Sequence, residues 1–133
     1  MYKTILLPLA YAPGHHPKSE FAAAKAVAAP GAHFILLHVL GPVPEFSTEH
    51  LPDTARGTLA EVVESDLAQQ AEGLLDAEVM VLQGDPAQEI LDLAAARKVD
   101  CIVMAPHRSD TGRYGSTTDR VARRAACSVH LVR

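Results

Sequence analysis

The sequence is poor in the residues that mark specialised classes of protein. It has only two cysteines, Cys101 and Cys127, in 133 residues, with no Cys-x-x-Cys spacing. Both have apolar neighbours near an expected strand, so we expect buried, reduced thiols rather than a disulfide framework. Tryptophan is absent, but with 48% hydrophobic and 21% charged residues the composition is that of an average globular chain. Intrinsic disorder is therefore excluded as the main state.

Long apolar runs and secretory signals are also lacking. Residues 1–4 run straight into a short apolar stretch, without a positively charged segment, a long apolar segment and a cleavage site. We therefore expect a cytoplasmic protein with no membrane partner. The length fits one domain over residues 1–133, large enough to bury about two-thirds of the surface of the unfolded chain.

Positive charge is scarce overall, with 12 Lys or Arg against 16 Asp or Glu and a net charge of −4. This balance argues against general nucleic-acid binding. The C-terminal part differs, because residues 101–133 hold six arginines and only two aspartates. A basic end suits a small phosphorylated ligand, and the same arginines also suit the solvated face of a last helix.

Five apolar runs predict the strands of a parallel sheet, because such strands are covered on both faces. They span residues 2–9, 33–40, 77–82, 100–104 and 129–132. Helical periodicity predicts helices over residues 18–29, 54–75 and 87–97, and a short helix after Thr118. The alternation predicts an α/β fold: a doubly wound, Rossmann-like five-stranded parallel sheet of order 3-2-1-4-5, with about four helices on both faces.

Local signals predict several helix boundaries. Pro17 suits the first turn of the first helix, and Pro30-Gly31 is expected to end that helix. Asp85 is a good N-cap for the third helix, with Pro86 at its first position. The second helix carries an apolar stripe, made of Leu59, Val62, Val63, Leu67, Ala71 and Leu74.

Ligands of such folds lie at the carboxyl ends of the strands, where the strand order reverses. Here that point lies between the first and fourth strands, next to residues 10–17 and 105–117. Within the second segment, Gly115-Ser116-Thr117 outlines a phosphate site, because backbone N–H groups and hydroxyls meet at a helix N-terminus. The alternative is structural: a glycine turn followed by a hydroxyl N-cap.

Several segments together carry a family resemblance. They are residues 5–9 (ILLPL), the end of the second strand at His38-Val39, residues 84–91 (GDPAQEIL) leading into residues 100–104 (DCIVM), and residues 115–129 (GSTTDRVARRAACSV). The last of these is the most specific. With these segments the chain resembles the universal stress protein family over essentially its whole length.

The resemblance implies a nucleotide site that has changed. In members that bind ATP, an aspartate after the first strand contacts the nucleotide, and a Gly-x2-Gly-x9-Gly-Ser/Thr loop after the fourth strand wraps the ribose and phosphates. The aspartate position falls here on Ala10, the first two glycines fall on Ala105 and Arg108, and the interval before Gly115 is about three residues shorter. The positions that the resemblance implies for nucleotide binding are Pro8, Leu9, Ala10, Val39, Met104, Ala105, Arg108, Gly115, Ser116 and Thr117.

These departures should weaken the family's ATP binding. Side chains at Ala105 and Arg108 occupy positions where glycine allows close approach, and a lost carboxylate at Ala10 costs about 1–3 kcal/mol if its donor stays unpaired. We therefore expect a non-enzymatic stress-response protein with lost or altered ATP binding, acting through an unidentified protein partner. The alternative is a signalling module that binds ATP or AMP, with Arg108, Arg113 and residues 115–117 on the phosphates.

The histidines allow two further hypotheses. His15, His16, His38 and His107 lie near the expected carboxyl ends of strands, but no His-x3-His or cysteine spacing supports a metal site. His107 with Ser116 suggests a small phosphate-ester hydrolase, yet there is no Gly-x-Ser-x-Gly elbow and no acidic third member. We expect neither a metal nor a catalytic residue.

The last strand is expected at an edge of the sheet, where unpaired backbone groups invite pairing with a second copy. The resemblance implies the same homodimer. Its expected interface is Ser128, Val129, His130, Leu131 and Val132.

Overall fold

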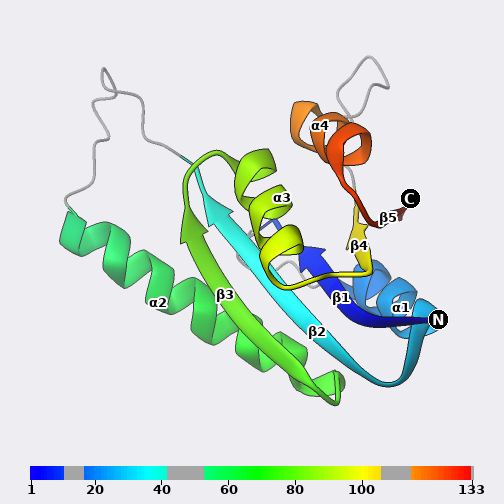
Figure 1. Ribbon diagram of the computed structural model, residues 1–133. Coiled ribbons are helices and arrows are strands. Elements are labelled where there is room, and N and C mark those ends of the chain that lie inside the picture. The colour runs from blue at the N-terminus through cyan, green and yellow to red at the C-terminus, as the bar shows by residue number, and fades with distance from the viewer. Residues whose placement is uncertain (11–16, 42–52, 106–114, 133) are drawn as a thin grey trace.

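The computed structural model describes residues 1–10, 17–41, 53–105 and 115–132 (Figure 1). These residues form a five-stranded parallel sheet of order β3-β2-β1-β4-β5. The strands are β1 (Tyr2–Pro8), β2 (Ala28–Leu40), β3 (Ala77–Gln83), β4 (Cys101–Met104) and β5 (Ser128–Leu131). The helices are α1 (Lys18–Val27), α2 (Asp53–Gln70), α3 (Pro86–Ala96) and α4 (Ser116–Arg124). The predicted fold class and strand order are confirmed.

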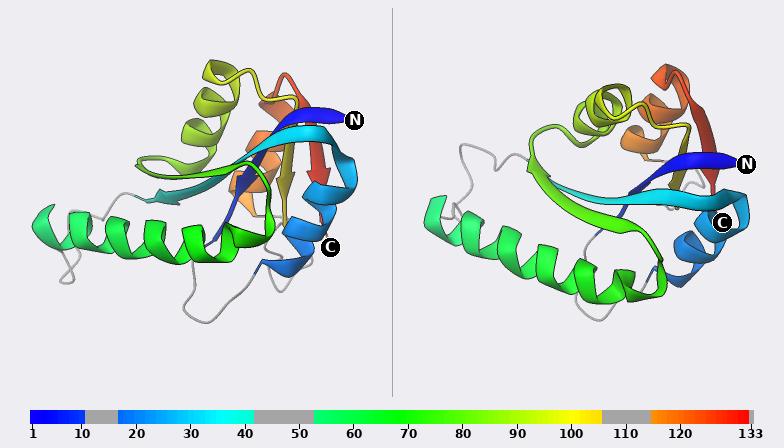
Figure 2. Two further views of the ribbon diagram at one scale, coloured as in Figure 1. Left: turned by 90° about the horizontal axis from the view of Figure 1, so that it is seen from below. Right: turned by 60° about the horizontal axis from the view of Figure 1, so that its bottom comes forward.

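Helices cover both faces of the sheet (Figure 2). Ile5 and Leu7 of β1 belong to one core cluster with residues of α1 and α2, whereas Leu6 belongs to a second cluster with residues of α3 and α4. This division follows from the alternation of side chains along a strand. All three side chains are completely buried, so β1 is the centre of the molecule.

The first helix is shorter than predicted, and the second strand is longer. α1 ends at Val27, and Pro30-Gly31 lies inside β2 instead of separating helix from strand. The pairing of β2 with β1 changes register between Tyr2 and Thr4, and Gly31 has a φ of +77°. The dipeptide therefore lies at an irregularity in the strand pairing, where glycine tolerates the positive φ.

The second helix also ends before its predicted end. α2 ends at Gln70 and is followed by the 3₁₀ turn Ala71–Gly73. In the predicted apolar stripe, Val63 and Leu67 are buried, but Leu59 and Val62 are exposed. The first half of α2, which includes Leu59, extends past the edge strand β3 (Figure 1). Val62 is exposed because it lies on another side of the helix from the buried Val63 and Leu67. Among the described residues, no helix combines the length and the apolar character that a membrane span requires.

One carboxylate connects the start of β4 to the start of β1. Asp100 accepts backbone N–H bonds from Lys3 at 2.9 Å and Thr4 at 3.0 Å. The bond from Lys3 makes the largest contribution to lowering the pKa of Asp100 below its usual range. The Asp100 backbone N–H also donates to the carbonyl of Thr4 at 3.0 Å. The parallel pairing of β1 with β4 therefore begins at a hydrogen-bonded anchor.

A charged cluster joins β2 to β3 at the other side of the sheet. The ring of His33 contacts Asp76 at 3.1 Å and Glu78 at 2.8 Å, and Glu78 is also paired with Arg97. The hydrogen bond to Glu78 is the main reason why the pKa of His33 is raised above 6.5, with a further contribution from Asp76. The protonated form of His33, a residue of β2, therefore stabilises the folded state.

We predict that this cluster makes stability fall as the pH rises. The folded pKa of His33 is raised, so its contribution is complete below the unfolded value of 6.5 and is lost as the pH rises through the folded value. Urea unfolding from about pH 5.5 to about pH 8.5 should show this loss, and His33→Gln should reduce the pH dependence. An NMR titration that places the folded pKa of His33 at or below 6.5 would contradict the prediction.

Candidate functional site

A cleft of about 270 Å³ lies at the carboxyl ends of β1, β2 and β4, where the strand order reverses. The wall opposite these strand ends comes from the starts of α3 and α4. Seven residues that the family resemblance implied line this cleft: Pro8, Leu9, Ala10, Val39, Met104, Ala105 and Thr117. The topology therefore brings together residues from four separate parts of the chain.

The other implied positions are placed differently. Gly115 and Ser116 are at the start of α4, next to Thr117, but they do not line the cleft. Arg108 lies outside the described residues, as do His15, His16 and His107, so the histidine convergence and the hydrolase pair fall there too.

His38 is the described member of that histidine group. It lines the cleft from β2, and its Nδ1 lies 2.9 Å from the carbonyl oxygen of Leu9. A carbonyl oxygen only accepts, so Nδ1 carries the proton in this hydrogen bond. The bond fixes the ring next to the end of β1, where it forms part of the cleft wall.

Four lining residues were missed by sequence reasoning. They are Leu37, Pro86, Ile90 and Thr118. Pro86 and Ile90 are four residues apart and therefore share one face of α3. The spacing could have predicted that these two residues share a face. The rule that ligands bind at strand ends, however, concerns β1 and β4 and does not identify the helix that faces them.

The lining combines apolar side chains with an imidazole and two threonines. Among the described lining residues there is no carboxylate and no cation. Gly115 is the N-cap of α4 and supplies no side-chain cap, while Ser116 is the first helical residue. The predicted hydroxyl N-cap is therefore wrong. The first turn of α4, which has no side-chain cap, borders the cleft through Thr117 and Thr118, and such a turn favours an anion.

The arginines of α4 do not enter the cleft. Arg120 is paired with Asp85 at 3.0 Å, Arg123 is paired with Asp119 at 3.0 Å, and Arg124 is exposed. The interpretation as a solvated helix face fits Arg123 and the exposed Arg124, whereas Arg120 connects α4 to α3. Arg108, Arg113 and Arg133 lie outside the described residues.

A larger hollow of about 560 Å³ lies at the opposite end of the sheet, between the start of β2 and residues 73–76. None of the residues implied by the resemblance lines it. In open parallel sheets, ligands bind at the carboxyl ends of the strands. The cleft at the carboxyl ends is therefore the better candidate for a ligand site, although its volume is smaller.

The two thiols are poor nucleophiles. Burial raises the pKa of Cys101 to about 11, and burial also raises the pKa of Cys127 above its usual value. Both cysteines are free, as expected, although Cys127 is only half-buried. Thiolate chemistry at neutral pH therefore has no support at either position. Among the described residues, no group of three or more His, Cys, Asp or Glu could hold a metal ion.

Comparison with known proteins decides the family. The model of the universal stress protein family matches residues 1–133. The chain belongs to the universal stress protein family. A universal stress protein of Thermus aquaticus, described as lying in the QAH/OAS sulfhydrylase 3′ region, is 38% identical over the full length of both chains.

Solved structures agree with this assignment. The hypothetical protein MJ0577 is 25% identical with a TM-score of 0.81, over 99% of this universal stress protein and 96% of that chain. A universal stress protein in complex with cAMP is 21% identical with a TM-score of 0.69, over 99% of this chain and 97% of that one. At 21% identity, the similarity to the cAMP complex concerns the fold alone.

In this universal stress protein, two of the positions at which the resemblance implies a departure from the ATP motif line the cleft. They are Ala10 and Ala105, and both are exposed, whereas Arg108 lies outside the described residues. At the position where the resemblance implies a carboxylate in ATP-binding members, the cleft wall here has the methyl group of Ala10. The departure changes the cleft wall itself and not a distant surface.

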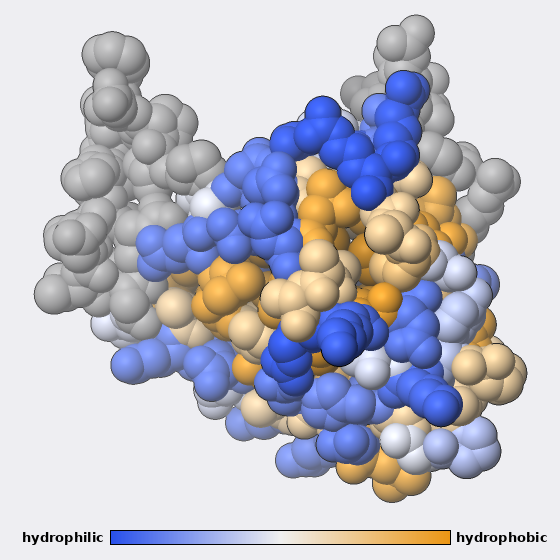
Figure 3. All heavy atoms as spheres, in the orientation of Figure 1, coloured by the Kyte–Doolittle hydropathy of each residue, from blue (hydrophilic) through white to orange (hydrophobic). Residues whose placement is uncertain are grey.

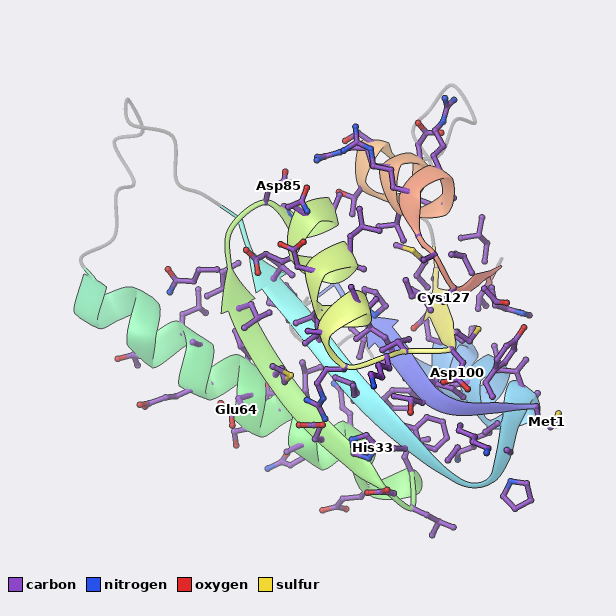
Figure 4. All side chains as sticks on the ribbon, in the orientation of Figure 1. Met1, His33, Glu64, Asp85, Asp100 and Cys127 are labelled. Carbon is purple, nitrogen blue, oxygen red and sulfur yellow. The ribbon has the colours of Figure 1, made fainter. Side chains whose placement is uncertain are left out.

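Asp85 holds the two helices of the cleft wall together. Its Oδ2 accepts the backbone N–H of Gln88 at 3.0 Å, so the predicted N-cap is confirmed. The same carboxylate is paired with Arg120 of α4, Nη1 to Oδ2, at 3.0 Å. Figure 4 shows Asp85 at the start of α3. One side chain thus caps α3 and links it to α4.

We predict that the cap contributes more stability than the ion pair. Asp85→Ala removes both and should lower the free energy of unfolding by about 1 kcal/mol. Asp85→Asn keeps the cap and should cost less than about 0.5 kcal/mol, because exposed ion pairs contribute little. Urea denaturation measures both values. Equal losses in the two variants would show instead that the ion pair dominates.

Proposed function

We propose that this universal stress protein is a non-enzymatic, cytoplasmic homodimer that acts through a protein partner and has an altered nucleotide cleft. The cleft takes a ligand of the size of an adenosine monophosphate and holds ATP poorly. The observation that carries this proposal is the small apolar cavity with Ala10 and Ala105 in its wall. Its 270 Å³ is just below the range of about 300–1,000 Å³ for common small-molecule sites.

The lining suits a nucleoside with one phosphate. Val39, Ile90 and Met104 offer apolar surface for a purine ring. The first turn of α4, with Thr117 and Thr118, offers N–H groups and hydroxyls for a phosphate. The relative in complex with cAMP supports a monophosphate ligand. The absence of a carboxylate at Ala10 removes one acceptor, so the affinity is modest.

We predict that Ala10→Asp raises the affinity for adenine nucleotides. A carboxylate at this position would pair with a donor of the bound nucleotide and contribute about 1–3 kcal/mol, or roughly 5- to 150-fold in Kd. Isothermal titration calorimetry with ATP, ADP and AMP measures the change. Ala105→Asp is the matched control, because it adds the same charge to the cleft at a position where the family has a glycine.

The wild-type titration tests the proposal directly. AMP should bind at least as tightly as ATP, and the Kd for ATP should be weaker than micromolar, less favourable than about −8 kcal/mol. A micromolar Kd for ATP, or no affinity for AMP at millimolar concentration, contradicts the altered cleft. An Ala105→Asp variant that gains as much as Ala10→Asp would show that the gain does not depend on the position after β1.

The dimer is proposed from the geometry of β5. Among the described strands, β5 pairs with β4 alone and lies at an edge of the sheet. Ser128 donates to Asp100 at 3.2 Å and Val132 donates to Met104 at 2.9 Å. Because N–H groups alternate along a strand, those of Val129 and Leu131 point to the outer edge. An outer row of donors and acceptors on an apolar strand favours pairing with a second copy.

We predict that Leu131→Pro dissociates the dimer. Proline removes one outward N–H but keeps the extended backbone that β5 needs. Leu131→Ala is the matched control, because it shortens the side chain and retains the N–H. Sedimentation velocity should show a dimer for the wild type and Leu131→Ala, and a monomer for Leu131→Pro. A monomeric wild type, or a dimeric proline variant that is folded by circular dichroism, contradicts the proposed interface.

A further inference from the structure

A third hollow, of about 310 Å³, lies between the ends of α3 and α4. We refer to it as the α3–α4 groove. Its apolar lining includes Leu91, Val99, Ala125 and Cys127. Figure 3 shows hydrophobic side chains gathered between these two helices, with hydrophilic side chains beside them. The groove shares no lining residue with the nucleotide cleft, so it is a separate feature of the same pair of helices.

The charges at the groove are all of one sign. Lys98 and Arg124 line it, and no acidic residue is among its described lining residues. Neither side chain takes part in an ion pair or hydrogen bond within the described part of the chain. The adjacent residues behave differently, since Arg97 is paired with Glu78 and Arg123 with Asp119. Of these four cations, the two that line the groove are the unpaired ones in the described part of the chain.

Lys98 also has an unusual backbone conformation. Its φ is +52°, and within the described residues no other side-chain-bearing residue has a positive φ. It lies one residue after the C-cap Arg97, and its N–H donates to Ala95 at 3.3 Å while that of Val99 donates to Ala94 at 2.9 Å. This is a Schellman motif, in which glycine is the preferred residue. A lysine in this position costs stability that a glycine would not cost.

We propose that the α3–α4 groove binds a small amphiphilic anion. The carboxylate or phosphate head lies between Lys98 and Arg124, and an apolar body of limited size fills the space beside Leu91, Val99 and Cys127. The volume is at the lower end of common small-molecule sites, so the body is about the size of one or two rings. The contribution of its side chain to this site accounts for a lysine at a strained backbone position.

An NMR titration of the whole chain tests this proposal. 2-Naphthoate and 2-naphthyl phosphate serve as probes with the two head groups, and 2-naphthylmethanol is the neutral control. Either anion should give saturable shifts in the amides of residues 91–99 and 124–127, and the alcohol should bind at least about fivefold more weakly. The preferred head group identifies the class of ligand. No saturable shift at these amides with either anion overturns the proposal.

Variants separate the site from a general charge effect. Lys98→Ala and Arg124→Ala should each weaken binding of the preferred anion at least about fivefold. Arg123→Ala is the matched control, since Arg123 is paired with Asp119 and does not line the groove. Equal weakening by Arg123→Ala and Arg124→Ala overturns the proposal.

Lys98→Gly tests whether the lysine side chain binds the anion or only occupies a backbone position that glycine prefers. It should raise Tm by a few degrees and weaken binding as much as Lys98→Ala does, because glycine relieves the strain but removes the cation. A stabilised Lys98→Gly variant with unchanged affinity would show that the lysine has no role in the groove. AMP should instead shift the amide signals near Ala10 and Thr117. A lack of binding at the groove therefore overturns only the groove proposal and not the proposed nucleotide cleft.

Discussion

The structure depends on the burial of a single strand from both sides. Ile5, Leu6 and Leu7 of β1 are completely inaccessible to solvent, and β1 has hydrogen-bonded neighbours on both edges. A strand in this position needs helices on both faces of the sheet, because an uncovered face would expose apolar side chains to water. The pairs α1 with α2 and α3 with α4 meet this need. The reversal of strand order next to β1 then leaves a cleft at its carboxyl end.

The two ends of β1 have different roles. At its start, Asp100 accepts two backbone N–H groups and so fixes the register with β4. At its end, the chain leaves the sheet at Ala10, and the cleft walls are apolar side chains and helix starts. The carboxylate that sets the register therefore lies at the end of β1 opposite to the cleft. This separation lets the cleft change without loss of the fold, as the replacements at Ala10 and Ala105 illustrate.

Much of the fold could be predicted because the signals are local. Uninterrupted apolar runs located all five strands, and Asp85-Pro86 located the start of α3. The errors arose where tertiary contacts override local preference. Pro30-Gly31 is a helix breaker in isolation, but the pairing of Ala28 with Tyr2 and of His33 with Thr4 includes it in β2. Leu59 shares a helix face with the buried Val63, yet it is exposed because the first half of α2 extends past β3 (Figure 1).

The candidate site could be predicted less completely. Family positions located Ala10, Ala105 and Thr117, which line one cleft. The α3 wall was missed because the contact of Ile90 with the strand ends depends on how the helix packs. The hydroxyl N-cap considered after the glycine turn was wrong because Gly115 itself is the N-cap of α4 and Ser116 is already helical. Spacing in the sequence shows which residues share a face, but it does not show what that face meets.

Helices α3 and α4 both contribute residues to the cleft and to the α3–α4 groove. Pro86 and Ile90 line the cleft from the first part of α3, and Leu91 and Ala94 line the groove from the next turn. The Asp85–Arg120 ion pair joins the two helices at the start of α3. A shift of α4 relative to α3 would therefore change the walls of both hollows. If binding in one hollow caused such a shift, linkage would require binding in the other to be affected by the same factor.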